Sequence, residues 1–341
     1  MRILITGASG FLGLAISRLL CARGDQIIGL QRRHSAALAE LGAEQVLAEL
    51  ADASAVRRAA AGADAVLHVG AKAGHWGSWQ DYHAANVVGT QNVLDACRQH
   101  GIRRLVYTST PSVVHGGGDL EGVDESLPYP TRFHAHYPAT KAIAERMVLA
   151  ANGAALATLA LRPHLIWGPG DNQLLPRIIE RARAGTLRLV GRAHLKRIDT
   201  IFIDNAAAAH VQALDRLAPA APCAGRAYFL AQGEPLSSAA MINALLDCAG
   251  LPPVTRSIPY PLAYAVGALM EAWWTLTRRA GEPLMTRFLA NQLATAHWYD
   301  LSAAHRVLGY APAVSLHEGF ALLRASLAAN PARNPAGLPA A

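Results

Sequence analysis

The stretch Ile3-Leu-Ile-Thr-Gly-Ala-Ser-Gly-Phe-Leu-Gly13 decides the fold, because an apolar run leads directly into closely spaced glycines. Gly7, Gly10 and Gly13 follow one another at intervals of three residues, between strand-like and helix-like sequence. Glycine allows a turn with positive φ, lets backbone N–H groups approach a pyrophosphate and lets a helix pack closely on a strand. The stretch therefore predicts a dinucleotide-binding loop at the start of a β-α-β unit.

Beyond this loop, short apolar runs alternate with longer stretches of helical periodicity. The runs at 3–5, 26–30, 65–69, 105–108 and 158–161 are predicted to be strands, and those at 14–23, 53–61, 86–100 and 138–152 helices. Because the strands are apolar throughout, helices should cover both faces of their sheet. The predicted fold class is α/β, a doubly wound Rossmann-type parallel sheet with a smaller, mostly helical substrate lobe.

The length of 341 residues exceeds the size at which one hydrophobic core usually keeps growing, which favours two lobes. After Pro163 the pattern becomes loop-rich and helical, with strand character again at 200–203 and 227–230. We expect a dinucleotide-binding domain over 1–165 and 198–232, and a substrate-binding lobe over 166–197 and 233–329. The Pro- and Ala-rich segment 330–341 is expected to be a disordered tail.

Composition narrows the class of protein. A hydrophobic content of 52% with 16% charged residues indicates a compact globular protein. The net charge of +7 is spread over separate arginine pairs, so no nucleic-acid partner is expected. The four cysteines lack metal-ligand spacing and suit free thiols in the cytoplasm, and no metal site is expected. No apolar run approaches the roughly 20 residues that cross a bilayer, which leaves only peripheral membrane contact open.

The second predicted strand ends in Gly29-Leu-Gln-Arg-Arg33, without a carboxylate. An NAD-binding loop of this type usually offers an acidic residue to the ribose hydroxyls, whereas arginine can pair with the 2′-phosphate of NADP. The alternative is that Arg32 and Arg33 are only solvated surface. We predict NADP(H) as the cofactor.

In Tyr137-Pro-Ala-Thr-Lys141 a phenol and an ammonium group stand one helical turn apart, on the same face of a helix. The nearby ammonium is expected to lower the tyrosine pKa from about 10, which would allow proton transfer near neutral pH. Hydroxyl side chains also follow the preceding apolar strand, where α/β proteins bind ligands. Thr110 is the first choice for a third catalytic group, with Ser109 and Ser112 as alternatives.

Taken together, these motifs resemble the extended short-chain dehydrogenases. The segments that carry the resemblance are the glycine loop, Asn86-Val-Val-Gly-Thr90, Tyr107-Thr-Ser-Thr110, Tyr137 to Lys141 and Leu161-Arg-Pro163. Within that superfamily the chain is similar to the 3β-hydroxysteroid dehydrogenase branch, through Ala71-Lys-Ala-Gly-His-Trp-Gly77, Thr110-Pro-Ser-Val-Val114, Asp119-Leu-Glu-Gly122 and Trp167-Gly-Pro-Gly-Asp171. The similarity covers about residues 1–329.

The resemblance and the glycine loop imply a set of cofactor-binding residues: Gly7, Ser9, Gly10, Phe11, Leu12, Gly13, Arg32, Arg33, Glu49, Leu50, Ala71, Lys72, Asn86, Lys141, Pro163 and Leu165. By resemblance, Asn86 would support the active-site helix, residues 71–72 would lie near the nicotinamide ribose, and 163–165 would border its ring. The chain departs from the pattern at two positions. Thr110 replaces the usual Ser but keeps the hydroxyl, and Glu49 stands where an Asp often meets the adenine amine.

The implied activity is NADPH-dependent reduction of the 3-keto group of a lipophilic 2-alkyl-3-oxoalkanoate, with Tyr137 as the proton donor. The alternatives are oxidation of a 3β-hydroxysteroid or other sterol, and a nucleotide-sugar epimerase or reductase. An alternative of another class is a non-catalytic NADP-binding regulator, which would not need Tyr137 and Lys141 together.

Two expectations concern surfaces. The resemblance implies a homodimer formed through the helices at 86–100 and 138–152. The second lobe is rich in aromatic and large apolar residues, most of which are expected to pack in its core, while those facing the cleft would suit a lipophilic ligand. These residues are Tyr260, Tyr264, Met270, Trp273, Trp274, Phe288 and Trp298.

Overall fold

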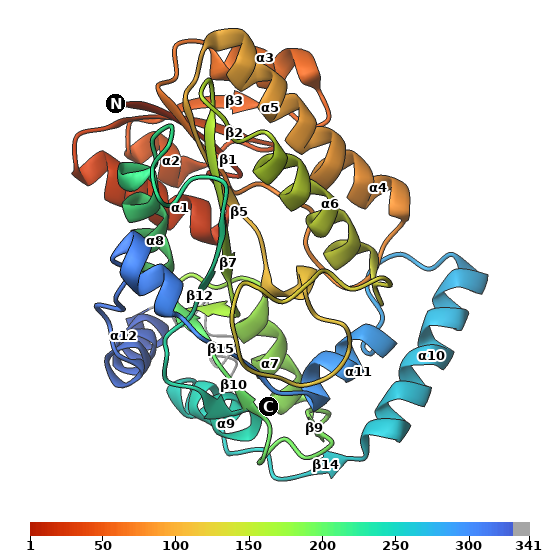
Figure 1. Ribbon diagram of the computed structural model, residues 1–341. Coiled ribbons are helices and arrows are strands. Elements are labelled where there is room, and N and C mark those ends of the chain that lie inside the picture. Colours follow the sequence, from red (N-terminus) through yellow and green to blue (C-terminus); the bar gives the residue numbers. More distant parts are fainter. Residues whose placement is uncertain (330–341) are drawn as a thin grey trace.

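The computed structural model describes residues 1–329, and a seven-stranded parallel sheet forms its centre (Figure 1). The strands follow the order β12-β7-β5-β4-β1-β2-β3, so the winding direction reverses between β1 and β4. The sheet contains β1 (Arg2–Thr6), β2 (Gln26–Gln31), β3 (Glu44–Leu47), β4 (Ala65–His68), β5 (Arg104–Thr108), β7 (Ala157–Pro163) and β12 (Ala227–Leu230). The predicted doubly wound α/β fold is confirmed, and ligands of such sheets bind beyond the carboxyl ends of the strands near this reversal.

Helices cover both faces of the sheet because successive side chains of a strand point to opposite sides. In β1, Ile3 and Ile5 belong to one apolar core, and Leu4 belongs to the other. The first core is covered by α1 (Phe11–Ala22) and α8 (Ile203–Arg216), and the second by α3 (Ala53–Ala60), α5 (Gly89–His100) and α6 (His136–Ala150). A short helix α2 (Ala36–Glu40) links β2 to β3.

A π-helical segment, η1 (Ala84–Val88), joins α4 (Trp79–His83) to α5 without a break in the helix. The helix predicted over 86–100 is therefore longer than its periodicity indicates, and its first residues belong to this wider turn. π-helical turns are rare and often occur at functional sites.

The rest of the described chain forms a smaller lobe below the carboxyl edge of the sheet (Figure 1). Its helices are α7 (Leu174–Arg183), α9 (Ser238–Cys248), α10 (Tyr260–Thr277), α11 (Arg287–Ala294) and α12 (Leu316–Ala329), with the π-helical η3 (Ala304–Leu308). Its short strands are β8 (Ile166–Trp167), β9 (Leu189–Val190), β10 (Arg197–Ile198), β11 (Ile201–Phe202), β13 (Leu236–Ser237), β14 (Ser257–Ile258) and β15 (His297–Tyr299).

One strand of the predicted first domain joins this lobe. β6 (Leu120–Val123) pairs with β15 in a four-stranded sheet of order β13-β10-β15-β6. The division into 1–165 with 198–232 and 166–197 with 233–329 therefore stays a prediction. The predicted tail, 330–341, lies outside the described residues.

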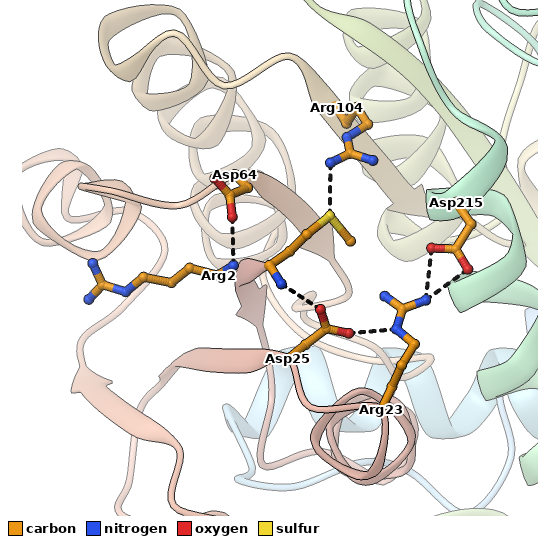
Figure 2. A network of polar contacts seen from close by, with 7 residues as sticks. Arg2, Arg23, Asp25, Asp64, Arg104 and Asp215 are labelled. Atoms are coloured by element: carbon orange, nitrogen blue, oxygen red, sulfur yellow. Dashed lines mark hydrogen bonds and ion pairs between the residues drawn. The ribbon is translucent and has the colours of Figure 1, made fainter.

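Ion pairs tie the start of β1 to two helices (Figure 2). The amino group of Met1 lies 2.7 Å from Asp25, and Asp25 accepts a 2.6 Å hydrogen bond from Arg23, which also pairs with Asp215 of α8. Burial raises the pKa of Asp25, but hydrogen bonds from Met1 and Arg23 outweigh it and lower the pKa overall. The network fixes the amino end of β1, at the end of the sheet opposite to the glycine loop.

The remaining composition-based expectations concern thiols, metals and membranes. All four cysteines are free, and burial raises the pKa of Cys97 to about 12. Within residues 1–329, no group of three or more His, Cys, Asp or Glu side chains is placed to hold a metal ion. No helix of this described part is both long and apolar enough to pass through a membrane.

Candidate active site

The glycine loop lies at the carboxyl end of β1, and its shape requires glycine. Gly7 has φ +67°, and a Cβ on Gly13 would lie 2.2 Å from the Gly7 carbonyl oxygen. A Cβ on Gly7 would lie 2.7 Å from the Cα of Gly70, at the end of β4. In the described structure no side chain caps the first turn of α1, which begins with Phe11 and Leu12, so its N–H groups can meet an anion. The loop fits a dinucleotide pyrophosphate.

The arginine pair lies beside this loop. Gly7 donates a 2.7 Å hydrogen bond to the carbonyl of Leu30, which brings the end of β2 against the loop. Arg32 and Arg33 follow and are exposed, whereas Gln31 is buried and donates a 2.9 Å hydrogen bond to Gln45. The two guanidinium groups are thus available to a ligand, and the Gln31 side chain serves the packing of β2 and β3.

The active-site helix α6 presents Tyr137 and Lys141 at the carboxyl edge of the sheet. The buried Lys141 ammonium donates a 2.6 Å hydrogen bond to the carbonyl of Thr108, and it lies 4.1 Å from the centre of the Tyr107 ring. Burial lowers the pKa of Lys141 to about 7, and Glu145 opposes this shift. Burial therefore weakens the charged form of Lys141 relative to a lysine in water.

The expected lowering of the Tyr137 pKa by Lys141 is wrong for this arrangement. Burial raises the pKa of Tyr137, and a hydrogen bond with Thr110 opposes the rise. Lys141 does not contribute, because its ammonium is directed to the end of β5. Thr110 is the hydroxyl that acts on the phenol, which favours it over Ser109, whose buried hydroxyl has no hydrogen-bond partner within the described structure.

Thr110 stands at a local turn that orients its hydroxyl. It precedes the 3₁₀ turn η2 (Pro111–Val113), and its Oγ1 accepts a 3.3 Å hydrogen bond from the backbone N–H of Ser112. The Thr110 Oγ1 also donates to the Ser112 hydroxyl at 3.3 Å. Thr110 and Ser112 thus form one small hydroxyl cluster beside Tyr137, and the third predicted hydroxyl, Ser109, is bound into the sheet edge through its backbone.

A buried carboxylate that the motifs did not single out stands one turn beyond Lys141. Glu145 accepts hydrogen bonds of 2.6 and 3.0 Å from Arg162 and one of 2.6 Å from the Tyr129 hydroxyl. Glu145 and Arg162 are 0% and 3% exposed, so this ion pair is fully desolvated. Tyr137, Lys141 and Glu145 are spaced four residues apart and share a face of α6. That spacing was the sequence signal that identified Tyr137 and Lys141, and it could have identified Glu145.

A second group that the sequence motifs did not identify is His68, which lies near Lys141 at the end of β4. Its two ring nitrogens contact the hydroxyls of Thr6 at 2.7 Å and Thr90 at 2.9 Å. Burial, with a smaller contribution from Lys141, lowers the pKa of His68 to about 3, so its ring is neutral. A neutral ring beside the ammonium adds no competing positive charge to the site.

Asn86 connects the predicted cofactor loop to α6. Its side chain accepts a 2.7 Å hydrogen bond from the N–H of Lys72 and donates to the Lys72 carbonyl at 3.0 Å. It also donates a 3.0 Å hydrogen bond to Thr140, which lies between Tyr137 and Lys141 on α6. The neighbouring Ala71 is exposed, and the Lys72 ammonium is 3.1 Å from Asp81. From its place in the π-helical turn η1, Asn86 thus binds both the segment at Lys72 and helix α6.

The segment after β7 approaches the site with a strained backbone. Pro163 is the last residue of β7, and Leu165 has φ +42°, which non-glycine residues rarely adopt. Between them, His164 contacts the Asp199 carbonyl at 2.6 Å, and burial lowers its pKa to about 4. The strain is retained because hydrogen bonds hold the backbone here: the His164 N–H donates to the Leu230 carbonyl at 3.0 Å, and the Leu165 carbonyl accepts from the Ile201 N–H at 3.3 Å.

The remaining predicted cofactor residues lie along the same edge. Ser9 and Glu49 are exposed, whereas Leu12 is buried in the first turn of α1. The carbonyl of Leu50 accepts a 2.9 Å hydrogen bond from Asn92. Phe11 lies next to Gly170, so it bridges the glycine loop and the loop after β8. The structure therefore brings the predicted residues to one edge, and their contacts with a cofactor stay a prediction.

A cavity of about 730 Å³ lies in the smaller lobe beyond this edge. Its wall includes Gly117, Asn291 and Tyr260, together with apolar Ile258 and Pro261. Gly117 accepts a 2.8 Å hydrogen bond from Asn291, and a Cβ on Gly117 would lie 3.1 Å from His134, three residues before Tyr137. One segment of the cavity wall thus contacts the residues that lead into the active-site helix.

The expected core packing of the second-lobe aromatic residues is wrong. None of the seven large residues considered from sequence is fully buried, and Tyr264 and Trp273 are exposed. Only Tyr260 lines the cavity. For the five of them that lie on α10, the reason is that this helix packs against little more than α11, with the small residues Ala263 and Gly267 as its only fully buried positions.

The fold and the site together define an NAD(P)-type oxidoreductase of the extended short-chain dehydrogenase class. The chain belongs to the 3-beta hydroxysteroid dehydrogenase/isomerase family, whose model matches residues 4–259. Over 331 residues it is 55% identical to the 2-alkyl-3-oxoalkanoate reductase of Stenotrophomonas maltophilia, a match that covers 96% of this chain and 100% of that protein.

Two further comparisons agree. The chain is 48% identical over 331 residues to the 2-alkyl-3-oxoalkanoate reductase of Shewanella oneidensis, covering 95% of this chain and 85% of that protein. Among solved structures, the crystal structure of gox2253 is similar with a TM-score of 0.77 and 24% identity, covering 96% of this chain and 98% of that chain. The sequence matches place the chain among reductases and dehydrogenases, and the structural match supports the fold.

Proposed function

We propose that the protein reduces the 3-keto group of a lipophilic 2-alkyl-3-oxoalkanoate to the 3-hydroxy acid, using NADPH. The observation that carries the proposal is the placement of Tyr137, Thr110 and Lys141 together at the carboxyl edge of the sheet, beside the glycine loop. The relatives named 2-alkyl-3-oxoalkanoate reductase support the choice of substrate class.

In this proposal Thr110 and Tyr137 hold the carbonyl oxygen of the substrate. When NADPH is bound, the hydride for the carbonyl carbon would come from its nicotinamide. The oxygen then takes the phenolic proton of Tyr137, so that the product is a neutral alcohol and Tyr137 is left as a phenolate. Because the phenol acts only when negative charge develops on the oxygen, its effect is on the transition state.

Lys141 has two tasks in the same scheme. Its ammonium lies one turn from Tyr137; it does not lower the pKa of the resting phenol, and in this proposal it acts on the phenolate only as the source of the returning proton. Its hydrogen bond to Thr108 holds it at the strand end, where it can meet the ribose of the cofactor. A pKa of about 7 allows Lys141 to return a proton to the phenolate at neutral pH.

The choice of NADPH rests on Arg32 and Arg33. Both are exposed, both follow the strand that contacts the glycine loop, and the described residues show no carboxylate paired with either. A 2′-phosphate would form charge-assisted hydrogen bonds with such groups. A homodimer through the surface of α5 and α6 and a cytoplasmic location belong to the same proposal.

The test follows the reverse reaction, oxidation of the 3-hydroxy acid, because this compound does not decompose in solution. Since 3-oxo acids with a free carboxyl group lose carbon dioxide, purified protein is given 2-alkyl-3-hydroxy acids with NADP⁺, and cofactor reduction is followed by absorbance. A 3β-hydroxysteroid and a UDP-sugar are the comparison substrates. We expect turnover with the hydroxy acids, and turnover with the sterol or the sugar alone would contradict the proposal.

Chain length gives a second test of the substrate class. Each buried methylene contributes about 0.8 kcal/mol, so two more methylenes should raise kcat/KM by somewhat more than about tenfold as long as the protein encloses the added length. The measurement is kcat/KM for a series of alkyl lengths below their solubility limits. A flat series would favour a small or polar substrate.

A further inference from the structure

The most apolar helix of the smaller lobe carries much of its apolar surface on the outside of the molecule. Five large apolar residues of α10 are between 39% and 79% exposed. They are Leu262, Val266, Leu269, Trp273 and Leu276. In Figure 1, α10 stands at the outer margin of the lobe, with α11 on its inner side. We call these five residues the α10 stripe.

The spacing of the α10 stripe makes it one continuous surface. Successive members are four, three, four and three residues apart, and at 100° per residue they fall within an arc of about 80°. The face that packs on α11 is a different one, because Gly267 approaches the backbone of Thr286 so closely that a Cβ would lie 2.6 Å from it. No segment within residues 1–329 therefore covers the stripe, which can make another contact.

Positive charge lies at both ends of this helix. Arg256 precedes it, Arg278 and Arg279 follow it, and all three are exposed. Between them the single acidic residue is Glu271, which is already paired with Arg287 at 2.6 Å. An apolar stripe between arginines complements an anionic lipid surface, where headgroups carry negative charge and acyl chains accept apolar side chains.

The same charges oppose pairing of two copies through the stripe. An antiparallel pair of α10 helices would bring Arg256 of one copy to Arg278 and Arg279 of the other, and a parallel pair would bring the arginine pairs together. With Glu271 held by Arg287, either arrangement places like charges side by side. A membrane surface meets no such opposition.

We propose that the protein docks on anionic membranes through the α10 stripe, with the helix lying in the plane of the lipid headgroups. No described helix is long and apolar enough to cross a bilayer, which agrees with a helix that lies on the surface. The purpose of the docking rests on the proposed function: the first turn of α10 forms part of the cavity wall through Tyr260 and Pro261, so a lipophilic substrate can pass from the membrane to the cavity.

The experiment is co-sedimentation of the full chain with vesicles of phosphatidylcholine alone or of phosphatidylcholine with one third phosphatidylglycerol. Wild type should bind the vesicles that contain phosphatidylglycerol, and added salt should weaken the binding. The double variant Leu269→Asn/Leu276→Asn should bind at least about tenfold more weakly, because two large apolar groups no longer enter the acyl region. Arg278→Gln/Arg279→Gln should also bind about tenfold more weakly.

Leu195→Asn is the matched control, because Leu195 is 69% exposed but lies outside the stripe. It should bind as wild type does, and circular dichroism should show all variants folded. Failure of wild type to bind either vesicle overturns the proposal, as does equal binding by wild type and the stripe variant. If the stripe variant instead changes the molecular mass in solution, the stripe joins protein chains and the membrane proposal fails.

Activity separates this proposal from the proposed function. With a short, water-soluble 2-alkyl-3-hydroxy acid in the absence of vesicles, the stripe variants should match wild type. Wild type that binds vesicles but turns over none of these acids would overturn the function and leave the docking in place. Turnover without vesicle binding would overturn the docking and leave the proposed function in place.

Discussion

Two helices of this protein reverse the usual relation between polarity and burial. α6 buries an ammonium and a carboxylate, Lys141 and Glu145, at the edge of the sheet, whereas α10 exposes leucine and tryptophan side chains to solvent. Burial of charge is costly unless each group is paired, and every charged group of the α6 face has such a partner. A helix face that buries charge therefore needs partners inside the molecule. A helix face that exposes large apolar side chains instead needs a contact outside it.

The strongest test of the α6 side is Tyr137→Phe. The change removes the proton donor and keeps the ring, so kcat/KM for the proposed substrates should fall by roughly 10²- to 10⁴-fold, while NADPH affinity measured by fluorescence titration stays close to wild type. Near-wild-type turnover would remove Tyr137 from its role.

The second test breaks the buried pair with Glu145→Gln. Arg162 would lose its carboxylate inside the protein, which should cost about 3 to 5 kcal/mol in the free energy of unfolding, measured by urea denaturation. Glu145 also supports the charged form of Lys141, so its loss should lower the pKa of Lys141 below its present value of about 7.

The sign of the pH effect follows from that shift. If the charged form of Lys141 is required, activity is present below its pKa and lost above it, so the alkaline limb of the kcat profile should move to lower pH in Glu145→Gln. Glu145→Asp should restore most of the profile. A profile that does not move would reduce Glu145 to a structural role.

The third test asks whether the exposed arginines beside the glycine loop bind a ligand. Arg32→Asp should remove a charge-assisted hydrogen bond worth about 1.5 to 3 kcal/mol and add repulsion, which turns a preference for NADP(H) of roughly ten- to a hundredfold toward NAD(H). The measurement is kcat/KM with both cofactors, with Arg33→Asp in parallel. Wild type that uses both cofactors equally would show that the pair is solvated surface.

The smallest effect tests the comparison itself. Val148 of α6 is 0% exposed and Leu269 of α10 is 71% exposed. Val148→Ala should lower the free energy of unfolding by about 2 kcal/mol, whereas Leu269→Ala should change it by less than about 0.5 kcal/mol. A large loss of stability in Leu269→Ala would mean that the α10 stripe is covered within the folded molecule.

Sequence carried the prediction furthest where local geometry limits the residue type. The glycine loop was recognisable because Gly7 and Gly13 permit contacts that no Cβ allows, and the apolar strands of the central sheet were confirmed. β3 was not predicted, since Glu44–Leu47 carries polar residues and lies at the edge of the sheet. Strands at an edge need less apolar surface.

The site was harder to predict where a residue acts through partners distant in sequence. His68 lies in an apolar strand, and only the fold brings Thr6 and Thr90 to its ring. The pKa of Tyr137 was predicted in the wrong direction because helical spacing does not determine where the Lys141 ammonium points. The aromatic residues of α10 were assigned to a core because composition does not reveal which helix face meets a neighbour.

The π-helical turn η1 sets the rotational phase between two successive helices. A π turn holds about one residue more than an α turn, so α4 and α5 differ by about 100° from a continuous α-helix. α5 is fixed in the core by Val93 and Leu94, and α4 holds the loop before it through a 3.2 Å hydrogen bond from Tyr82 to the Trp76 carbonyl. Deleting a single residue from η1 would rotate α4 and turn Tyr82 away from that loop. The residue types of Tyr82 and of the loop would be the same as before. The shape of this part of the site is therefore encoded in residue count, and sequence comparison by residue identity alone would overlook it.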